Sequence, residues 1–466
     1  MDMRFLLQLL HTLKAYRERE HWTRQQLASY QAASLRALRD HAYAHSPFYQ
    51  QFHHGLTDRP LSELPVLTKS MLMEHFDSLV TDRAVHLEAV REHMAHASAA
   101  RLFLGRYHVA VTPGSSGHSG LFLFSPPEWL TVMASFARGQ GWADAWVSPL
   151  RRQRVAVVAS VNPWHLSAQV GAAARTWWTP ALRLPASDPL ETVVRQLNDW
   201  RPDRLIAYAS MLRVLADEQR VGRLRISPQH VFATSEVLTG ETRRRILQAW
   251  GATPYNQYAA TGTACLAAAR AGCRRMHVFE DLLLIEVVDR HYHPVPPGTY
   301  GTKLLVTVLF SRTQPLIRYE LDDSVRLSPD PCSCGLPFAV LDSIQGRVED
   351  ALWLPAPDGG RVTVAPLAFG EVLDALPVSG WQLVHQPDDS LIVLLSGARN
   401  ELSGSGSTYE GPVRDALKDA LRKQLTQVLA DHGASVPHIA VQWVDSIPQT
   451  SAGKTLPVVT RWPPGQ

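Results

Sequence analysis

The pattern of apolar and polar positions along this chain of 466 residues changes near residue 55 and again near residue 347. Up to residue 55, apolar side chains such as Leu27, Leu35 and Leu38 recur at roughly helical spacing. This first region is therefore predicted to be helical.

Residues from about 100 to 345 alternate short β-rich runs with helical segments. The runs at 154–159 and 204–208 are β-rich, and the segments at 189–200 and 240–250 have helical character. Such alternation is typical of α/β proteins with largely parallel strands. Within this region, 282–310 differs, because two β-rich runs joined by a proline and glycine turn predict an antiparallel hairpin.

The C-terminal pattern predicts a smaller α+β domain. A helix at 365–376, a hairpin around 386–389, a long helix at 411–432 and a strand at 438–444 follow one another. We therefore expect a large N-terminal α/β domain of mixed or parallel sheets, 1–346, and a small mobile C-terminal lid domain, 347–466.

Composition narrows the class of partners. Hydrophobic residues make up 45% of the chain, and 46 basic against 43 acidic residues leave a net charge of +3. Neither nucleic acid nor an anionic membrane surface is predicted as a partner from this balance. The sequence shows no bilayer-length apolar run and no secretory cleavage pattern, so a cytoplasmic location is expected.

Two loops carry groups suited to phosphate. The first is rich in serine and glycine and also contains a histidine: Ser115, Ser116, Gly117, His118, Ser119 and Gly120. Backbone N–H groups and hydroxyls in such a loop bind anionic oxygens, although the loop lacks the Gly-Lys-Ser/Thr ending of a P-loop and a flexible surface turn remains the alternative. The second loop presents Lys454 after the predicted strand at 438–444.

A third segment ends an apolar run with Arg318, Tyr319 and Asp323. Its carboxylate can accept ribose hydroxyls and its arginine can neutralise phosphate, whereas a surface salt bridge is the alternative reading. Gly346, Arg347 and Glu349 follow at the predicted domain boundary, where they suit either a hinge or an ordinary linker.

In this order, the segments resemble the adenylate-forming superfamily of acyl-CoA synthetases and adenylation domains, and within it the phenylacetate–CoA ligase branch. The resemblance implies that the serine and glycine loop holds phosphates, that Asp323 and Arg347 contact ribose, and that Glu349 lies on the hinge. It implies a catalytic role for Lys454, at the carboxylate and α-phosphate. The other residues that it places at the nucleotide are Glu236, Tyr258 and Thr261; Arg318 and His118 are the further catalytic candidates.

One position departs from the family pattern. The family's glutamate that helps bind magnesium is replaced here by Gly262, after Tyr258 and Thr261. Either another acid such as Glu236 takes over the metal, or adenylation is slow or lost.

The cysteines lie only between residues 265 and 334 and predict a metal site rather than a disulfide framework. Cys273, His277, Cys332 and Cys334 would complete a tetrahedral structural zinc site, with buried free thiols as the alternative.

The resemblance thus implies an ATP- and Mg²⁺-dependent enzyme that converts a carboxylic acid, aromatic or arylalkanoic, to an acyl-adenylate and transfers it to CoA. An amine or a carrier protein as acceptor, and a degenerate binding scaffold, are the alternatives. Trp164 and His165 follow a predicted strand and are candidates for the acyl pocket. Relatives in the branch are often dimers, so a homodimer is a further expectation.

Overall fold

The computed structural model describes residues 3–112, 119–145, 151–398, 412–435, 438–450 and 453–460. The chain forms two compact units, each assembled from separate stretches of sequence. Unit 1 comprises 1–153, 160–181 and 255–343, and unit 2 comprises 154–159, 182–254 and 344–466. The C-terminal region thus belongs to the same unit as 182–254. None of the described helices has the length and apolar character needed to cross a membrane.

Most of the helices of unit 1 precede its sheets, and the predicted helical character of 1–55 is confirmed. Thr23 begins the second helix with a capping box, in which its side chain and that of Gln26 satisfy each other's backbone N–H groups. The helices are α1 (Met3–Arg19), α2 (Arg24–His45), α3 (Pro47–Phe52), α4 (Lys69–Glu74), α5 (Phe76–Leu79), α6 (Leu87–His96), α7 (Pro126–Trp142) and α8 (Leu166–Ala173).

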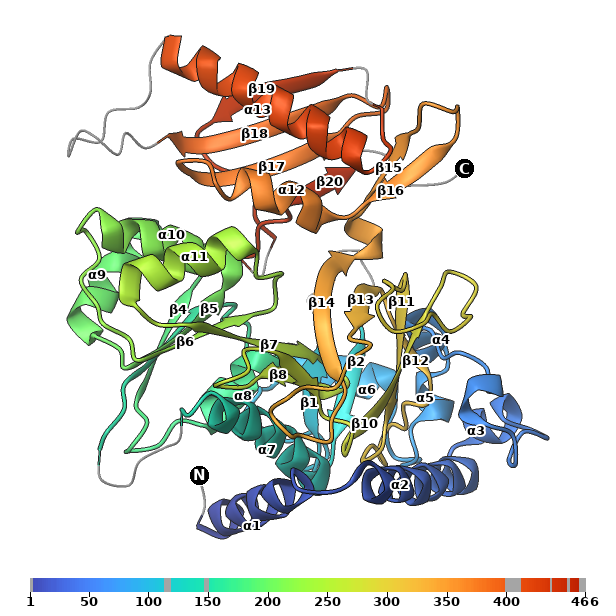
Figure 1. The fold of residues 1–466 in the computed structure, drawn as a ribbon. Helices are drawn as coiled ribbons and strands as arrows, with labels where there is room; N and C mark the ends of the chain where they lie inside the picture. Colours follow the sequence, from blue (N-terminus) through green and yellow to red (C-terminus); the bar gives the residue numbers. More distant parts are fainter. Residues whose placement is uncertain are drawn as a thin grey trace. The chain divides into compact units, whose positions relative to one another are not determined.

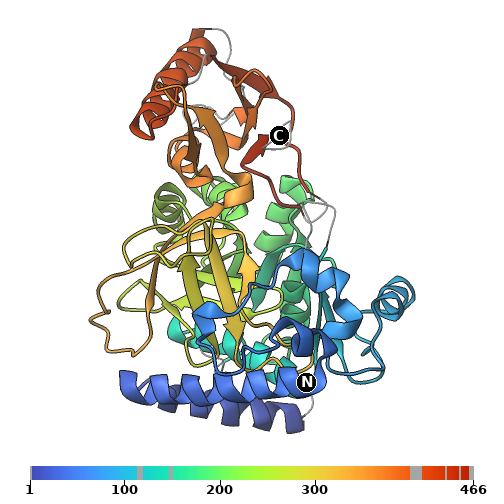
Figure 2. The same ribbon diagram turned by 90° about the vertical axis from the view of Figure 1, so that its right-hand side faces the viewer.

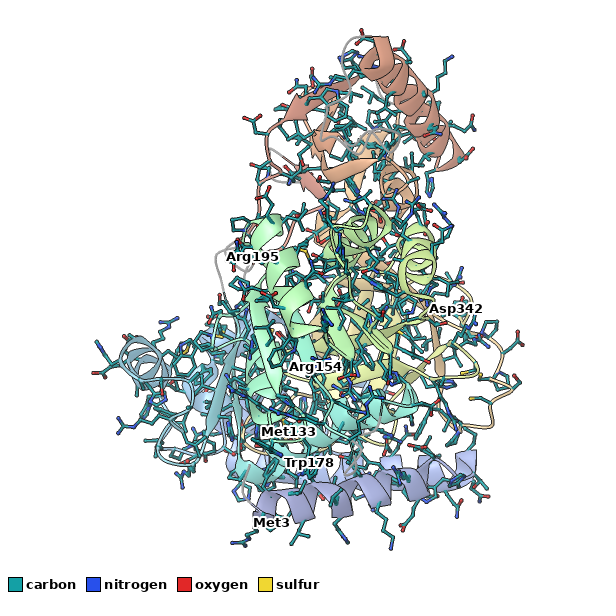
Figure 3. All side chains as sticks on the ribbon, turned by 90° about the vertical axis from the view of Figure 1, so that its left-hand side faces the viewer. Met3, Met133, Arg154, Trp178, Arg195 and Asp342 are labelled. Atoms are coloured by element: carbon teal, nitrogen blue, oxygen red, sulfur yellow. The ribbon has the colours of Figure 1, made fainter. Side chains whose placement is uncertain are left out.

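A buried arginine fixes α1 against α7 (Figures 1 and 2). Arg138 of α7 is only 2% exposed, and its guanidinium lies 2.7 Å from Asp281 and 3.3 Å from Glu20. Aromatic rings, including that of Trp142, surround the same guanidinium at about 5 Å. Met133 of α7, labelled in Figure 3, is also buried. The N-terminal helices are thus tied to the sheets of unit 1.

The strands of unit 1 are mostly antiparallel. They are β1 (His108–Val111), β2 (Leu121–Phe124), β7 (Pro254–Ala260), β8 (Ala264–Ala269), β9 (Met276–Val278), β10 (Leu283–Val288), β11 (Lys303–Val308), β12 (Tyr319–Leu321), β13 (Asp323–Leu327) and β14 (Val340–Arg347). The predicted hairpin in 282–310 is confirmed, because β10 and β11 pair antiparallel with Leu283 opposite Val308. The expected parallel arrangement does not extend to this unit, where β7, β8, β9 and β14 pair antiparallel in the order β7-β8-β9-β14.

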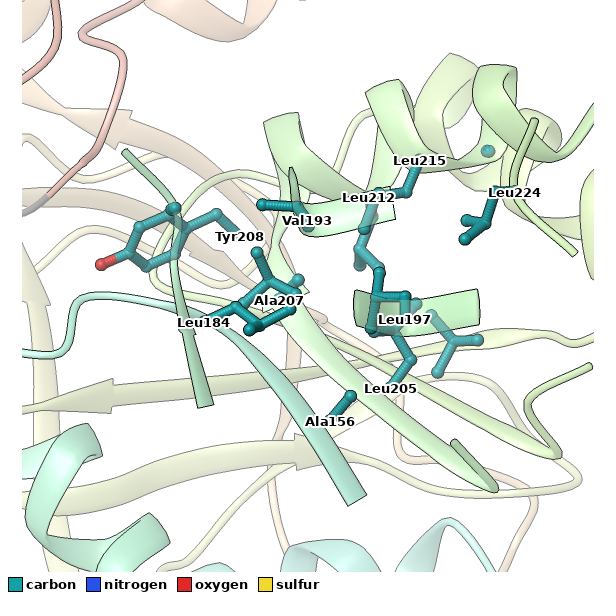
Figure 4. Packing of buried hydrophobic residues seen from close by; sticks show 14 of the residues in the cluster. Ala156, Leu184, Val193, Leu197, Leu205, Ala207, Tyr208, Leu212, Leu215 and Leu224 are labelled. Carbon is teal, nitrogen blue, oxygen red and sulfur yellow. The ribbon is translucent and has the colours of Figure 1, made fainter. Parts of the chain in front are cut away.

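The parallel strands occur in unit 2. They are β3 (Val155–Ala159), β5 (Arg204–Tyr208) and β6 (His230–Thr234), with β4 (Ala181–Pro185) at the edge. The helices α9 (Leu190–Trp200), α10 (Ala209–Arg220) and α11 (Gly240–Trp250) lie beside them in Figure 1. Figure 4 shows the apolar core between them, in which Leu197, Leu205 and Leu212 are fully buried.

The C-terminal part of unit 2 has its own core. Its elements are β15 (Leu352–Pro355), β16 (Arg361–Val364), α12 (Pro366–Leu373), β17 (Val378–His385), β18 (Leu391–Ala398), α13 (Pro412–Asp431), β19 (Ile439–Val444) and β20 (Val458–Thr460). The sheet has the order β19-β18-β17-β20, and Leu421 and Leu425 of α13 are completely buried in the core that it covers. The predicted α+β character of this region is confirmed, and β15 and β16 add a hairpin that the pattern did not predict.

Candidate active site

The predicted phosphate loop connects the two strands of a hairpin. Val111 of β1 pairs with Leu121 of β2, and Thr112 closes the base of the loop through two hydrogen bonds with Gly120. Gly120 is therefore held directly before the start of β2, and Ser119 precedes it. Ser115, Ser116, Gly117 and His118 lie outside the residues that the structure describes, so their roles stay predictions.

Tyr258 and Asp323 meet in unit 1. Tyr258 lies on β7, Asp323 begins β13, and the tyrosine hydroxyl donates a 2.7 Å hydrogen bond to Oδ2 of the aspartate. This bond orients the carboxylate, whose oxygens are hydrogen-bond acceptors. Thr261 is half-buried in the turn that follows β7. The three residues expected at the nucleotide thus lie on neighbouring elements of one unit.

Gly262 occupies a position with no room for a side chain. A Cβ atom there would lie 2.4 Å from Cε1 of Phe122 and 3.0 Å from Cδ1 of Leu316. Phe122 is buried on β2 and packs edge-on against Tyr319. The space beside Gly262 is therefore filled by an aromatic ring, and no side chain fits there without displacing it.

Arg318, a predicted catalytic residue, is buried and engaged by unit 1 itself. Only 4% of the residue is exposed, its guanidinium lies 3.1 Å from Glu286, and it also donates to the carbonyl of Leu64. Its backbone N–H donates to Thr307, and its φ of 51° is unusual for a residue other than glycine. Its observed contacts are those of a residue that fixes the end of β12.

Trp164 and His165 flank the base of the phosphate loop. The carbonyl of Trp164 accepts a hydrogen bond from Val111, the last residue of β1, and the indole ring packs on His93. His165 is buried directly before α8. Trp164 therefore contacts β1, and His165 follows it in the chain. Their role in an acyl pocket stays a prediction.

Lys454 reaches a second segment within unit 2. Its Nζ donates a 3.1 Å hydrogen bond to the carbonyl of Ser235 and lies 5.4 Å from the centre of the Tyr208 ring. Ser235 has a left-handed φ of 65°, which is uncommon for a residue other than glycine and marks a constrained turn after β6. Gly453, also left-handed, has no room for a Cβ, which would lie 2.9 Å from the backbone nitrogen of Ser187.

Glu236 lies beside that contact with unused acceptor capacity. Its Oε2 accepts a hydrogen bond from the backbone of Ser210, whereas its buried Oε1 has no partner among the described residues. Burial raises the pKa of this carboxyl, and the neighbouring Lys454 opposes that change. A carboxylate oxygen next to an ammonium group can accept a donor or a cation from a ligand.

Arg347 and Glu349 lie at the start of the C-terminal region. The guanidinium of Arg347 is 3.0 Å from the Glu349 carboxylate, and both side chains are more than one-third exposed. Gly346 before them adopts a φ of 109°, a conformation open only to glycine at low cost. The segment is thus a surface turn whose charged side chains face solvent.

Cys273, His277, Cys332 and Cys334 converge in unit 1. The pairing of β9 with β14, and of His277 with Val340, brings the two halves of the cluster together. Their ligand atoms all lie within 4.8 Å of one another, with Nε2 of His277 3.5 Å from Sγ of Cys273 and 3.4 Å from Sγ of Cys334. Tetrahedral zinc, with bonds of about 2.3 Å to sulfur and 2.0 Å to nitrogen, separates such atoms by about 3.5 Å. Burial lowers the pKa of His277 to about 4, which keeps the imidazole neutral as a ligand must be.

Some residues beside the candidate site could not be recognised from the sequence. Phe122, Tyr208 and the carbonyl of Ser235 acquire their roles only through folding, because an aromatic core residue and a backbone oxygen carry no recognisable motif. The residues expected at one site occur in two sets, one in each unit: Tyr258, Thr261 and Asp323 in the first, and Lys454, Glu236 and Arg347 in the second.

Comparison with known proteins gives two curated relatives, and no family model matches the chain. The phenylacetate–coenzyme A ligase of Thermus thermophilus is 26% identical over 287 residues, covering 59% of this chain and 60% of the relative. Protein CapK of Staphylococcus aureus is 24% identical over 269 residues, covering 57% of this chain and 54% of the relative. The matches thus span less than two-thirds of either relative.

Solved structures extend the likeness of the fold to almost the whole chain. A 2-hydroxyisobutyryl-CoA ligase in its postadenylation state, in complex with an acyl-AMP, gives a TM-score of 0.71 at 18% identity, covering 95% of this chain and 91% of that one. The same ligase in its thioesterification state, with acyl-AMP and CoA, gives a TM-score of 0.55 at 18% identity, again with 95% and 91% coverage. These comparisons confirm both the predicted fold class and the resemblance stated from the sequence.

Proposed function

We propose, from its adenylate-forming fold and its similarity to phenylacetate–CoA ligase, that this chain is an AMP-forming carboxylate ligase. It would activate a carboxylic acid with ATP and transfer the acyl group to CoA. The observation that carries the proposal is the position of Lys454, an ammonium group on a C-terminal loop that lies against the Ser235–Glu236 segment.

In the first half-reaction, a carboxylate oxygen of the acid attacks the α-phosphorus of ATP. A new O–P bond forms, the bond to the leaving oxygen of pyrophosphate breaks, and acyl-adenylate and pyrophosphate result. The two reactants are anions that repel each other, so a cation between them lowers the barrier most where charge develops. Lys454 would provide that cation. In the second half-reaction the CoA thiol attacks the acyl carbon, and AMP leaves.

Each unit contains candidate groups for the nucleotide. Asp323, oriented by Tyr258, would accept the ribose hydroxyls, and the exposed Arg347 would add a donor to the ribose. Ser119 and Gly120 would continue the phosphate loop.

Magnesium would neutralise the phosphates of ATP. The only group of three or more candidate ligands among the described residues is the Cys/His cluster, so no ready-made magnesium cage is found there. Mg²⁺ usually binds through substrate phosphates, water and one or two carboxylates rather than in an all-protein cage. Glu236, with its buried and unpartnered Oε1, is the candidate protein ligand in place of the glutamate absent at Gly262.

The Cys/His cluster would hold a structural zinc ion. Three thiolates and one neutral imidazole supply four protein ligands, so the site would be closed and would take no part in the reaction. Its function would be to join the 270–278 turn to the 332–334 loop.

The acid and the acceptor are the finer parts of the proposal. An aromatic or arylalkanoic acid is favoured by the similarity to phenylacetate–CoA ligase, with Trp164 and His165 as candidates for the acyl pocket. CoA is favoured as acceptor because the ligase with the highest quoted TM-score was solved with it in a further state. An amine or a carrier-protein thiol is the alternative acceptor. We propose the cytoplasm as the location of the reaction.

The decisive experiment is acid-dependent ATP–pyrophosphate exchange with the full-length protein across a panel of aryl, arylalkanoic and short aliphatic acids. We expect exchange with at least one acid, followed by thioester formation on addition of CoA. Exchange without thioester would redirect the acceptor to an amine or a carrier protein.

One observation favours a second function, that of a nucleotide- or acyl-binding scaffold without catalysis. The ring of Phe122 fills the space beside Gly262, the residue that replaces the magnesium-binding glutamate of the family pattern. ATP binding by calorimetry without exchange on any acid would support the scaffold and overturn the ligase.

A further inference from the structure

A buried ion pair joins two segments of unit 2 that are far apart in the sequence. Arg213 lies on α10, and Asp374 directly follows α12; Nε of the arginine is 3.3 Å from Oδ1 of the aspartate. Arg213 is 2% exposed and Asp374 is 8% exposed. Neither residue carries a motif in the sequence, and neither belongs to the nucleotide-binding set described above.

Arg213 also binds the first strand of the C-terminal sheet. Its two terminal nitrogens donate to consecutive backbone carbonyls at the start of β17, that of Val378 at 2.9 Å and that of Ser379 at 3.0 Å. One guanidinium from the 182–254 segment thus contacts a carboxylate and two carbonyls of the 344–466 segment. The planar fork of arginine suits such a fixed set of acceptors.

Asp374 is satisfied from both sides of the contact. Its Oδ2 accepts hydrogen bonds from Thr239 at 2.7 Å and Thr242 at 3.1 Å, and its Oδ1 accepts from the indole of Trp381 at 2.8 Å. Thr239 is also the N-cap of α11. Next to it, Glu371 accepts from the backbone N–H of Gly240 at 2.9 Å.

The contact is built mainly from charges and hydrogen bonds. Breaking a buried pair by removing one partner is costly, but groups of this kind regain hydrogen bonds to water when two surfaces separate. An apolar contact of the same size would lose its stabilisation outright on separation. A polar contact is therefore suited to two segments that hold one arrangement firmly and also come apart.

The same contact sets the position of Lys454. Thr239 lies four residues after Ser235, whose carbonyl accepts the hydrogen bond from Lys454, and Asp374 and Lys454 belong to the same C-terminal region. Fixing α12 and β17 against α10 and α11 fixes the base from which the Lys454 loop extends. A displacement of about 1 Å at a reacting group can cost about 100-fold in rate.

We propose that Arg213 and Asp374 are positioning residues for the adenylation half-reaction. They clamp the C-terminal region onto the 182–254 segment and hold Lys454 at the Ser235–Glu236 turn, and the clamp opens for the transfer to the thiol. This inference rests on the proposed ligase function. A ligase of similar fold has been solved in both a postadenylation and a thioesterification state.

The test separates the two half-reactions. In Arg213→Met the charge and the carbonyl contacts are lost, while Asp374 keeps its donors from Thr239, Thr242 and Trp381, so the fold should persist. We expect acid-dependent ATP–pyrophosphate exchange to fall by about 10- to 100-fold. Thioester formation from chemically supplied acyl-adenylate and CoA should stay at the wild-type rate or rise.

Matched variants exclude a merely structural effect. Arg213→Lys should restore part of the exchange rate, because it returns a charge to Asp374 without the second carbonyl contact. Arg220→Met, on the same helix at a more exposed position, should leave both half-reactions unchanged. If both half-reactions fall together in Arg213→Met, or neither changes, the proposal is overturned. Should Arg213→Met fail to fold, Asp374→Asn gives the same split in a milder form.

Failure of the ligase function would be recognised separately, because the wild-type protein would then show no exchange with any acid. In that case hydrogen exchange of the backbone amides still tests the clamp. Arg213→Met should increase exchange in both 237–246 and 370–381, and Arg220→Met should not. Unchanged protection in both segments would overturn the clamp whatever the protein catalyses.

Discussion

Arg318 in unit 1 is buried among groups of its own unit, whereas Lys454 in unit 2 lies on a loop and is only partly buried. In unit 1, Arg318 is buried against Glu286 and the Leu64 carbonyl, and the Cys/His cluster brings four ligand atoms within 4.8 Å. In unit 2, Lys454 sits on a loop over Tyr208, and Oε1 of the neighbouring Glu236 lacks a partner among the described residues.

The difference separates residues that build the protein from residues that act on a substrate. A buried polar group with all its partners stabilises the fold, and removing one partner is costly. A group whose partner would come from a ligand is held at some cost in stability, and its loss is felt in activity. Substitutions at Arg318 or in the Cys/His cluster should therefore reduce stability first, and substitutions around Lys454 should reduce the reaction first.

The largest effect is expected from opening the Cys/His cluster. Replacing Cys332 with serine should abolish zinc binding and lower the free energy of unfolding by about 5 kcal/mol or more, because metal affinity of this class of site is folding energy. Metal analysis of the purified protein and denaturant unfolding would measure both. Cys265→Ala, at a buried thiol outside the cluster, should still bind one zinc ion per chain. Full stability in Cys332→Ser would show that the cluster needs no metal.

Next in size is the loss of the buried arginine. Arg318→Met leaves the Glu286 carboxylate without its charged partner and should cost about 3–5 kcal/mol of stability. Adding Glu286→Gln should recover part of that loss, as measured by a double-mutant cycle in urea. Wild-type stability with lost adenylation would instead support the catalytic role predicted for Arg318.

Lys454→Ala, unlike Arg318→Met, should reduce activity and leave stability almost unchanged. We expect a loss of at least about 100-fold in pyrophosphate exchange, the scale of one donor that stabilises charge in the transition state. Its melting temperature should stay close to that of the wild type, because the side chain is partly exposed. Lys423→Ala, an exposed lysine on α13, serves as the control. Near-wild-type exchange in Lys454→Ala would refute the assignment.

A smaller effect should follow from adding one methyl group at Gly262. The new Cβ would lie 2.4 Å from Phe122, so Gly262→Ala should cost about 1–3 kcal/mol through overpacking. Phe122→Leu in the same protein should relieve part of that cost. Gly262→Glu, which returns the family carboxylate, should not raise the exchange rate unless Phe122 is also reduced. A faster reaction in Gly262→Glu alone would mean that the ring moves aside readily.

The smallest effect is expected at Glu236. Burial raises the pKa of its carboxyl in the folded protein, so the ionised form opposes folding, and this cost grows as pH rises through the folded pKa. Glu236→Gln should therefore melt slightly higher than the wild type at pH 7 to 8. The difference in melting temperature should disappear below pH 4.5, the ordinary pKa of the group. The exchange activity of Glu236→Gln should be lower than that of the wild type. A lower melting temperature at pH 8 would contradict this account.

The sequence predicted the elements with strong periodicity. The run at 204–208 became β5 and the segment at 240–250 became α11, with the same bounds. β5 is a short β-rich run that is buried almost throughout, and α11 is an amphipathic helix that buries one face. The Cys/His cluster was predicted only from residue types that suit zinc. The pairing of β9 with β14, which brings these residues together, was not predicted.

What the sequence did not predict depends on contacts between distant segments. β7, β8, β9 and β14 pair antiparallel, whereas largely parallel strands were expected, because pairing direction is set by the connections and not by the strands themselves. Arg213 and Asp374 are 161 positions apart by their numbering and meet only after folding. Phe122 closes the space beside Gly262 for the same reason.

The glycine before the catalytic candidate has one more consequence. Gly453 lies so close to the backbone of Ala186 and Ser187 that a single added carbon would push the loop outward. The absence of a Cβ at residue 453 thus allows the loop to bring the Lys454 ammonium group as far inward as it does. Gly453→Ala and then Gly453→Val should move Lys454 progressively outward. The distance between its ammonium group and the reacting atoms could thus be varied by substitution.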